Sequence, residues 1–122
     1  MRTLLDMVIE GDPVPKARPR SGRNGHTYTP QRTRDAEKVI RDLAAELVDE
    51  PYDGPVAISC HFECATARRT DGDNLMKLVW DALNGVVYVD DSQIRLWYGG
   101  LVRKSPTPQT RVLVYTVESK EA

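Results

Sequence analysis

The 122-residue sequence lacks several features that would assign it to a class at once. It has no apolar run near the roughly 20 residues that a membrane-spanning helix needs. Its N-terminus places Asp6 and Glu10 beside short apolar stretches, which is not the layout of a signal peptide. It also lacks an excess of positive charge, because 17 Lys and Arg residues stand against 18 Asp and Glu residues. We therefore expect a cytoplasmic protein with one domain over residues 1–122, and not a strongly basic coat protein of nucleic acid.

Cysteine is also scarce, with only Cys60 and Cys64 in the chain. Residues 56–64 alternate between apolar and polar types, which is typical of a strand with one buried face. The alternation places both thiols on that face about 13 Å apart, at roughly 3.3 Å per residue, which is too far for a disulfide. The same alternation turns His61 to the opposite face. Buried core thiols are therefore favoured over a zinc site.

The remaining pattern predicts an α/β (α+β) domain, in which a mixed sheet packs with two helices. The order of elements is strand-helix-strand-helix-strand-strand. The strands are expected at residues 4–10, 56–64, 94–103 and 111–118, and the helices at residues 30–49, after an N-cap at Thr29, and 71–83. Gly99 and Gly100, within one predicted strand, indicate a bulge or bend.

Positive charge is concentrated in one segment. Residues 14–34 carry six cations and no acid, and prolines and glycines make the segment a loop. The cations are Lys16, Arg18, Arg20, Arg23, Arg32 and Arg34. The net charge of -1 is therefore the sum of +6 here and -7 elsewhere. DNA or RNA is the natural partner, because arginine binds phosphate bidentately and phosphate contacts release counterions. A solvated loop is the alternative.

Acidic residues stand where predicted elements begin or end. Asp71 and Asp73 open the second helix, and Asp91 follows the short apolar run after it. If the three carboxylates converge, they repel each other by roughly 4 kcal/mol for two unit charges 4 Å apart at an effective dielectric constant near 20. A bound cation would be needed to offset this repulsion. Oxygen ligands favour magnesium or manganese. The alternative is that Asp71 and Asp73 only cap the helix and that Asp91 belongs to a turn.

Lys77 lies one helical turn beyond Asp73, on the face opposite the apolar stripe, so it is available to such a site. The alternative is a surface charge ladder of Asp73, Lys77 and Asp81. Arg68 and Arg69 directly precede the acids and would suit a phosphodiester substrate.

These residues resemble the RusA family of Holliday junction resolvases. The resemblance is strongest from Arg69 to Gln93, and its motif residues are Arg69, Asp71, Asp73, Asn74, Leu75, Lys77, Asp81, Ala82, Leu83, Asp90, Asp91 and Gln93. A second segment resembles the basic stretch of phage-type members, and it contains Gly11, Pro13, Pro15, Lys16, Arg18, Pro19 and Arg20.

The resemblance implies a RusA-like fold and a magnesium-dependent endodeoxyribonuclease, with manganese as a substitute. Such an enzyme works as a homodimer in a bacterial or phage-infected cell, and resolves four-way DNA junctions by paired nicks in recombination and repair. The family's catalytic, metal-binding acids carry over onto Asp71, Asp73 and Asp91, and its functional lysine onto Lys77. The segment between Asp73 and Asp91 is one residue shorter than in the best-known member, so Asp90 stays an alternative to Asp91.

We predict that DNA is contacted by Lys16, Arg18, Arg20, Arg23, Arg68 and Arg69. Two other functions are left open by the sequence. One is a non-catalytic nucleic-acid-binding domain, and the other is a metal-dependent nuclease for other branched or duplex DNA.

Overall fold

Four strands form the central sheet in the computed structural model, which describes residues 1–17, 20–22 and 25–118. In the order in which they lie side by side, the strands are β1 (Thr3–Glu10), β6 (Gln109–Thr116), β4 (Val56–Glu63) and β5 (Ile94–Val102). The β4–β5 pair is parallel, and the other two pairs are antiparallel. The predicted mixed sheet and the order of the main elements are therefore confirmed.

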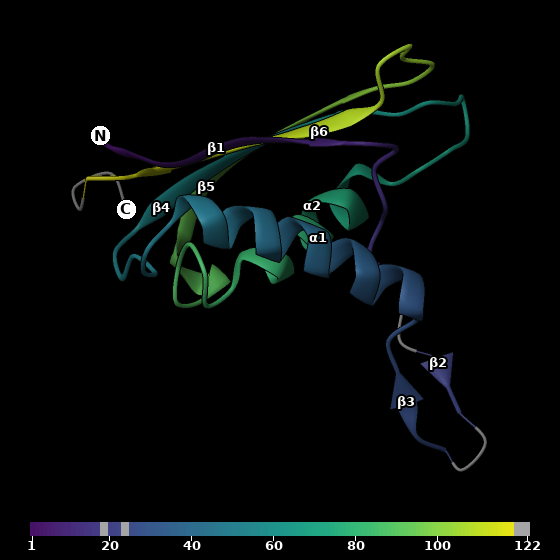
Figure 1. Ribbon diagram of the computed structural model, residues 1–122, viewed down its shortest axis with the longest axis horizontal. Coiled ribbons are helices and arrows are strands. Elements are labelled where there is room, and N and C mark those ends of the chain that lie inside the picture. Colours follow the sequence, from purple (N-terminus) through teal and green to yellow (C-terminus); the bar gives the residue numbers. More distant parts are fainter. Residues whose placement is uncertain (18–19, 23–24, 119–122) are drawn as a thin grey trace.

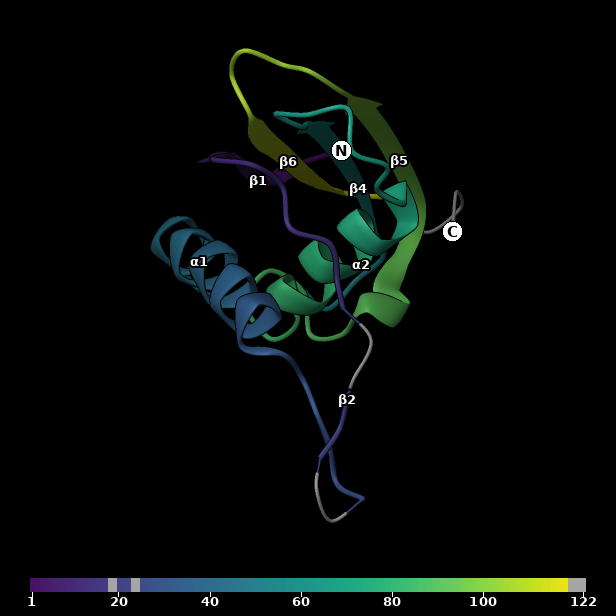
Figure 2. The same ribbon diagram turned by 90° about the vertical axis from the view of Figure 1, so that its right-hand side faces the viewer.

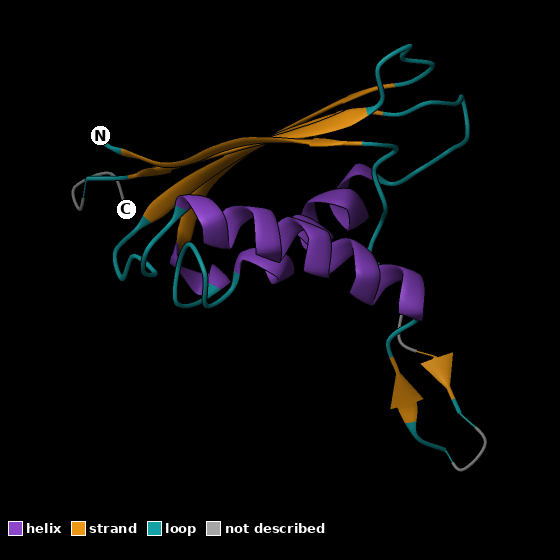
Figure 3. Ribbon diagram, viewed as in Figure 1, coloured by secondary structure: helices purple, strands orange, loops and turns teal. Residues whose placement is uncertain are grey.

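Two helices cover one face of this sheet and leave the other face open (Figures 1 and 3). They are α1 (Gln31–Leu47) and α2 (Gly72–Leu83), and each turns its apolar stripe toward the core. The predicted cap of the first helix is wrong by one residue, because Pro30 is the N-cap and no side chain caps it. Within the described residues, no helix has the length and hydropathy needed to cross a bilayer.

The alternation of β4 places its two faces as predicted. Ile58, Cys60 and Phe62 are buried beneath the helices, whereas His61 is exposed on the open face. Both cysteines are buried and form no disulfide, and burial raises the pKa of the Cys60 thiol to about 12. The thiols are therefore protonated core groups, as expected.

The basic segment contains structure where we predicted only a loop. Two short strands, β2 (Arg20–Ser21) and β3 (Thr27–Tyr28), pair into a hairpin that projects from the body of the domain (Figure 1). Arg18 and Arg23, two of the predicted DNA contacts, lie outside the described residues, and Arg20 is described only by its backbone place in β2.

The bulge that we expected at Gly99 and Gly100 is absent, because the β4–β5 register passes both glycines without a shift. A Cβ atom at Gly99 would lie 2.7 Å from the Sδ atom of Met76 on α2. The absence of a side chain at Gly99 is therefore what allows α2 to pack closely on β5 at Met76.

The β4–α2–β5 crossover determines where the candidate site lies. Because β4 and β5 are parallel, the loops that follow them leave from the same edge of the sheet. These loops contact each other there: the Ser105 amide donates to the Cys64 carbonyl (2.9 Å), and the Lys104 amide donates to the Thr66 carbonyl (3.2 Å). From this edge α2 runs back across the sheet, and the chain then passes through a short 3-10 helix, η1 (Asp91–Gln93), into β5.

Candidate active site

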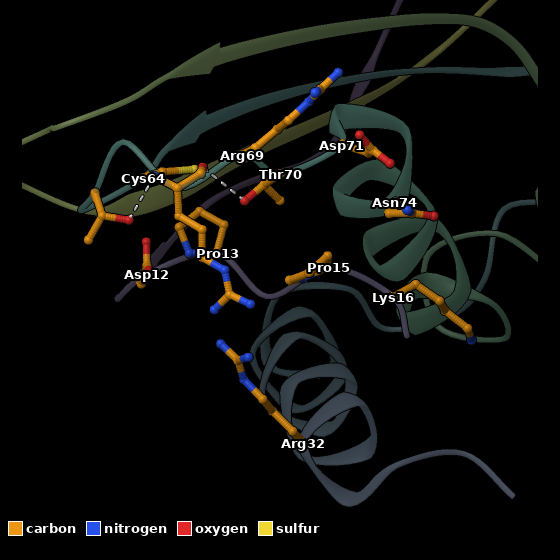
Figure 4. A pocket seen from close by; sticks show the side chains of 12 residues that line it. Asp12, Pro13, Pro15, Lys16, Arg32, Cys64, Arg69, Thr70, Asp71 and Asn74 are labelled. Carbon is orange, nitrogen blue, oxygen red and sulfur yellow. Dashed lines mark hydrogen bonds between the residues drawn. The ribbon is translucent and has the colours of Figure 1, made fainter. Parts of the chain in front are cut away.

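A basic cavity of about 580 Å³ lies where the loop after β4 approaches the start of α1. Arg32 reaches toward it from the first turn of α1, and Asp71 and Asn74 border it at the start of α2 (Figure 4). Arg68 and Arg69 come from the loop after β4. The parallel strand pair and the first turns of both helices thus bring together cations that are 36 residues apart in the chain, from 32 to 68.

The arginines of this cavity have no carboxylate partner in the part of the chain that the structure describes. Among the described residues, Arg32, Arg68 and Arg69 form no ion pair, and all three are exposed. Unpaired guanidinium groups at one cavity are suited to bidentate binding of phosphate. The sequence pointed to Arg68 and Arg69, but we did not single out Arg32 from the basic segment, and only its place at the cavity distinguishes it.

Arg103 is a further cation at this edge that the sequence reading missed. It follows β5, and its Nη2 atom donates to the carbonyl of Thr70 at 3.4 Å. It therefore helps to hold the loop that presents Arg68 and Arg69. Its place here follows from the parallel pairing of β4 and β5, which the spacing of residues along the chain did not specify.

Asp71 does not act as the helix cap that the alternative interpretation required. It occupies the N-cap position of α2, but its side chain accepts no capping hydrogen bond. Its exposed carboxylate borders the basic cavity instead. Asp73, in the first turn, accepts only from the neighbouring amide of Asn74 (3.0 Å) among the described residues. Both carboxylates are thus available to a ligand.

A second hollow, of about 460 Å³, runs along α2, and we call it the α2 groove. Its walls are α2 on one side and β5 with η1 on the other. It is lined by Asp73, Asn74, Met76, Lys77, Trp80, Asp81, Asp91 and Trp97. The rings of Trp80 and Trp97 meet edge to face at 5.7 Å between centroids. Acidic groups thus occupy both ends of the groove, and apolar side chains lie between them.

The two acids of the turn at residues 90–93 have different roles, since one caps η1 and the other borders the α2 groove. Asp90 caps η1, and the hydrogen bond from Ser92 lowers the pKa of its carboxyl. Gln93 anchors the turn by donating from Nε2 to the carbonyls of Tyr52 (2.7 Å) and Gly54 (2.8 Å). Asp91 is the acid that borders the α2 groove. Of the two candidates, Asp91 is therefore the one whose carboxylate is placed for a ligand.

Asn84 orients Asp91 and was not predicted to do so. Its Nδ2 atom donates to Oδ2 of Asp91 at 3.3 Å, while its Oδ1 atom is buried without a hydrogen-bond partner among the described residues. We interpreted Asn84 only as the stop signal of the helix. The bond ties Asp91 to the C-terminal end of α2.

The three acids do not meet within one chain. Asp73 and Asn84 are eleven positions apart along α2, which separates their Cα atoms by about 16 Å at 1.5 Å per residue. The start of α2 and the η1 turn accordingly lie toward opposite ends of the helix (Figure 2). In the part of the chain that the structure describes, no three His, Cys, Asp or Glu side chains are grouped to hold a metal ion. The donors have the right chemistry for magnesium, but the described residues of a single chain do not form the three-carboxylate site.

Lys77 does not belong to the charge ladder that we considered. Among the described residues it forms no ion pair, because Asp81 is paired with Lys16 at 2.7 Å. The exposed Lys77 ammonium faces the α2 groove together with Asp73.

Lys16 is engaged by carboxylates and not left free for a phosphate. Its Nζ atom bonds Glu37 of α1 (2.9 Å) and Asp81 of α2 (2.7 Å), and in Figure 4 its side chain points away from Arg32. Burial alone would lower the pKa of Lys16, but the bonds to Asp81 and Glu37 outweigh it and raise the pKa. Lys16 thus clamps the two helices together.

Replacing Lys16 with methionine is expected to lower the free energy of unfolding by about 1–2 kcal/mol, because two half-buried carboxylates lose their shared cation. Since the pKa is raised in the folded state, this contribution is fully present below the ordinary lysine pKa of 10.5 and is lost as pH rises through the higher folded value. Urea unfolding at pH 7 and above pH 10.5 measures both effects. Lys38→Met, which removes an exposed pair with Asp42, is the control and should cost only about 0.3–0.5 kcal/mol.

Among the described residues, the arginines of the basic cavity and Lys77 form no ion pair, and they lie beside a groove that holds carboxylates. This arrangement is typical of a protein that acts on a nucleic-acid backbone. Sequence comparison agrees, since the family model described as endodeoxyribonuclease RusA matches residues 10–115. The chain belongs to the RusA family of endodeoxyribonucleases, and this membership implies a nuclease that resolves Holliday junctions. A search of curated proteins found no match.

Proposed function

We propose that this protein is a divalent-cation-dependent endodeoxyribonuclease that resolves four-way DNA junctions by paired hydrolysis of phosphodiester bonds. The observation that carries the proposal is the start of α2, where Asp71 borders the basic cavity and Asp73, two residues later, borders the α2 groove. A phosphate held by the arginines would thus lie beside the acidic groups that the family uses for cleavage.

The described residues suggest how the substrate is held. Arg32, Arg68 and Arg69 bind phosphates of the DNA backbone, with Arg103 holding the loop that carries two of them. Lys77, one turn from Asp73, neutralises charge on the phosphate that is cut. These backbone contacts carry no base information, so they position DNA without selecting a sequence.

We propose Mg²⁺ as the cofactor, with Mn²⁺ as a substitute, because Asp71, Asp73 and Asp91 offer only oxygen donors. We also propose that the protein acts as a homodimer in the cytoplasm of a bacterial or phage-infected cell. A dimer with two-fold symmetry suits a four-way junction, whose own approximate two-fold symmetry presents two equivalent strands.

A cleavage assay on an immobile four-way junction tests this function. We expect paired nicks in the presence of Mg²⁺ and none with EDTA, and we expect little cutting of a flap or a linear duplex of the same sequence. If the protein cuts flap and duplex as fast as the junction, it is a nuclease of broader specificity.

The same assay separates the enzyme from a binding domain. A non-catalytic domain would bind the junction with or without metal and cut nothing. The Asp73→Asn variant should still bind the junction in a gel-shift assay but should not cut it, since the substitution leaves the basic cavity unchanged. Wild-type cutting by this variant would contradict the assignment of Asp73.

A further inference from the structure

Resting on the proposed nuclease function, we propose that Asn84 is a positioning residue for the cleavage reaction, which holds the Asp91 carboxylate in one orientation at the α2 groove. In this role Asn84 acts through Asp91 and does not itself contact the reacting atoms. The proposal rests on three features of the end of α2: the backbone of Asn84, the partners of its side chain and the anchoring of the turn that carries Asp91.

The backbone at the end of α2 does not require an asparagine. Asn84 is the C-cap of the helix, with φ -58° and ψ 128°, a conformation that most residues adopt readily. The next residue, Gly85, carries the positive φ of 78° at which the chain turns. The cap hydrogen bond runs from the backbone amide of Asn84 to the carbonyl of Asp81, so any residue except proline would form it. The end of the helix therefore does not explain the Asn84 side chain.

The side-chain amide of Asn84 is paired at one end only. Nδ2 donates to Oδ2 of Asp91 at 3.3 Å, and Oδ1 is buried without a hydrogen-bond partner among the described residues. A buried acceptor without a partner costs free energy. Turning the amide over would set its oxygen against the carboxylate, so that two acceptors faced each other. The fold thus retains a costly group at this position, and the one side-chain partner of that group among the described residues is Asp91.

The backbone of Asp91 is anchored by other residues. Gln93 donates from Nε2 to the carbonyl of Tyr52 (2.7 Å), and its Oε1 atom accepts from the amide of Asp90 (2.9 Å). Asn84 therefore determines only the direction of the Asp91 carboxylate. With Oδ2 held, Oδ1 of Asp91 has no side-chain or backbone partner among the described residues and is left for a ligand. A reactive group that is already held in one orientation loses less conformational entropy when it binds.

The Asn84→Leu variant separates positioning from folding. Leucine has nearly the shape of asparagine, but it cannot donate a hydrogen bond and brings no buried carbonyl. We expect a urea midpoint equal to or above that of the wild type. We expect nicking at saturating junction to be about 10–100-fold slower, the usual loss when the partner of a metal-binding carboxylate is removed. Junction affinity in EDTA should not change, because Asn84 and the basic cavity lie toward opposite ends of α2.

Gln93→Leu is the control for a structural role. It leaves the carbonyls of Tyr52 and Gly54 without their donor, so its urea midpoint should fall below that of the wild type. If Asn84→Leu is destabilised in the same way, Asn84→Asp decides, since aspartate has the size of asparagine and, when ionised, also cannot donate. Wild-type nicking by a folded variant at position 84 would overturn the inference.

A double variant shows whether Asn84 acts through Asp91. If it does, adding Asn84→Leu to Asp91→Asn should slow the residual nicking no further, since the carboxylate that Asn84 orients is already gone. A further loss of about 10-fold or more would mean that Asn84 acts independently of Asp91, and would overturn the inference.

A magnesium titration reads the same role without DNA and without cutting. The thermal unfolding midpoint of the wild type should rise with Mg²⁺, because an ion that binds the folded protein stabilises it. Asn84→Leu should need about 10-fold more Mg²⁺ for the same rise. If the wild type cuts no junction and the two titrations still differ in this way, the positioning role stands and the proposed function fails. Equal titrations, or a wild type that does not respond to Mg²⁺, overturn the inference.

Discussion

The Asp91→Asn variant is expected to cut a four-way junction more than about 100-fold more slowly than the wild type, since it removes a charged group placed for the reaction. Asn has nearly the size of Asp and can still contact Asn84 at the end of α2. The fold and the basic cavity should therefore be unchanged. The initial rate of nicking at saturating Mg²⁺, with junction affinity measured separately, checks this expectation.

Asp90→Asn is the matched control, one residue away. The Asp90 carboxylate caps η1 by accepting from the Ser92 amide at 3.0 Å, and asparagine is an equally good N-cap. We therefore expect nearly wild-type cutting. The opposite result, with Asp90→Asn inactive and Asp91→Asn active, would transfer the catalytic role to Asp90.

The double variant Arg68→Gln/Arg69→Gln is expected to bind the junction about 10-fold or more weakly at moderate salt, because two unpaired guanidinium groups leave the basic cavity. The slope of log affinity against log salt concentration should fall by about 1.8, at about 0.9 for each lost phosphate contact. A salt series of gel-shift or anisotropy measurements gives both numbers.

Arg111→Gln removes the same charge from a different place and serves as the control. Arg111 lies on the open face of the sheet and pairs with Asp6 at 3.2 Å. Its loss should alter the salt slope by much less than the loss of one cavity arginine. If all three arginines contributed equally, binding would depend on overall charge and not on the cavity.

Local patterns were sufficient for the elements and for the buried face of β4. Alternation over eight residues decides which side chains face the core, and this is why the two thiols and His61 were placed correctly. The spacing of Leu75, Leu78 and Val79 likewise predicted a helix whose opposite face carries Lys77. The charge of the basic segment was also visible in the sequence, although its short hairpin was not.

The sequence by itself determined the four strands of the central sheet, the two helices, the position of the acids at element boundaries and the family motif, because periodicity and spacing are local properties. Only the tertiary structure decided which of those residues meet. It places Arg103 beside the loop of Arg68 and Arg69 through the parallel pairing of β4 and β5. It also engages Lys16 with two carboxylates and holds Asp91 at the far end of α2. These outcomes depend on how strands pair and where a helix ends in space, which the spacing of residues along one chain does not specify.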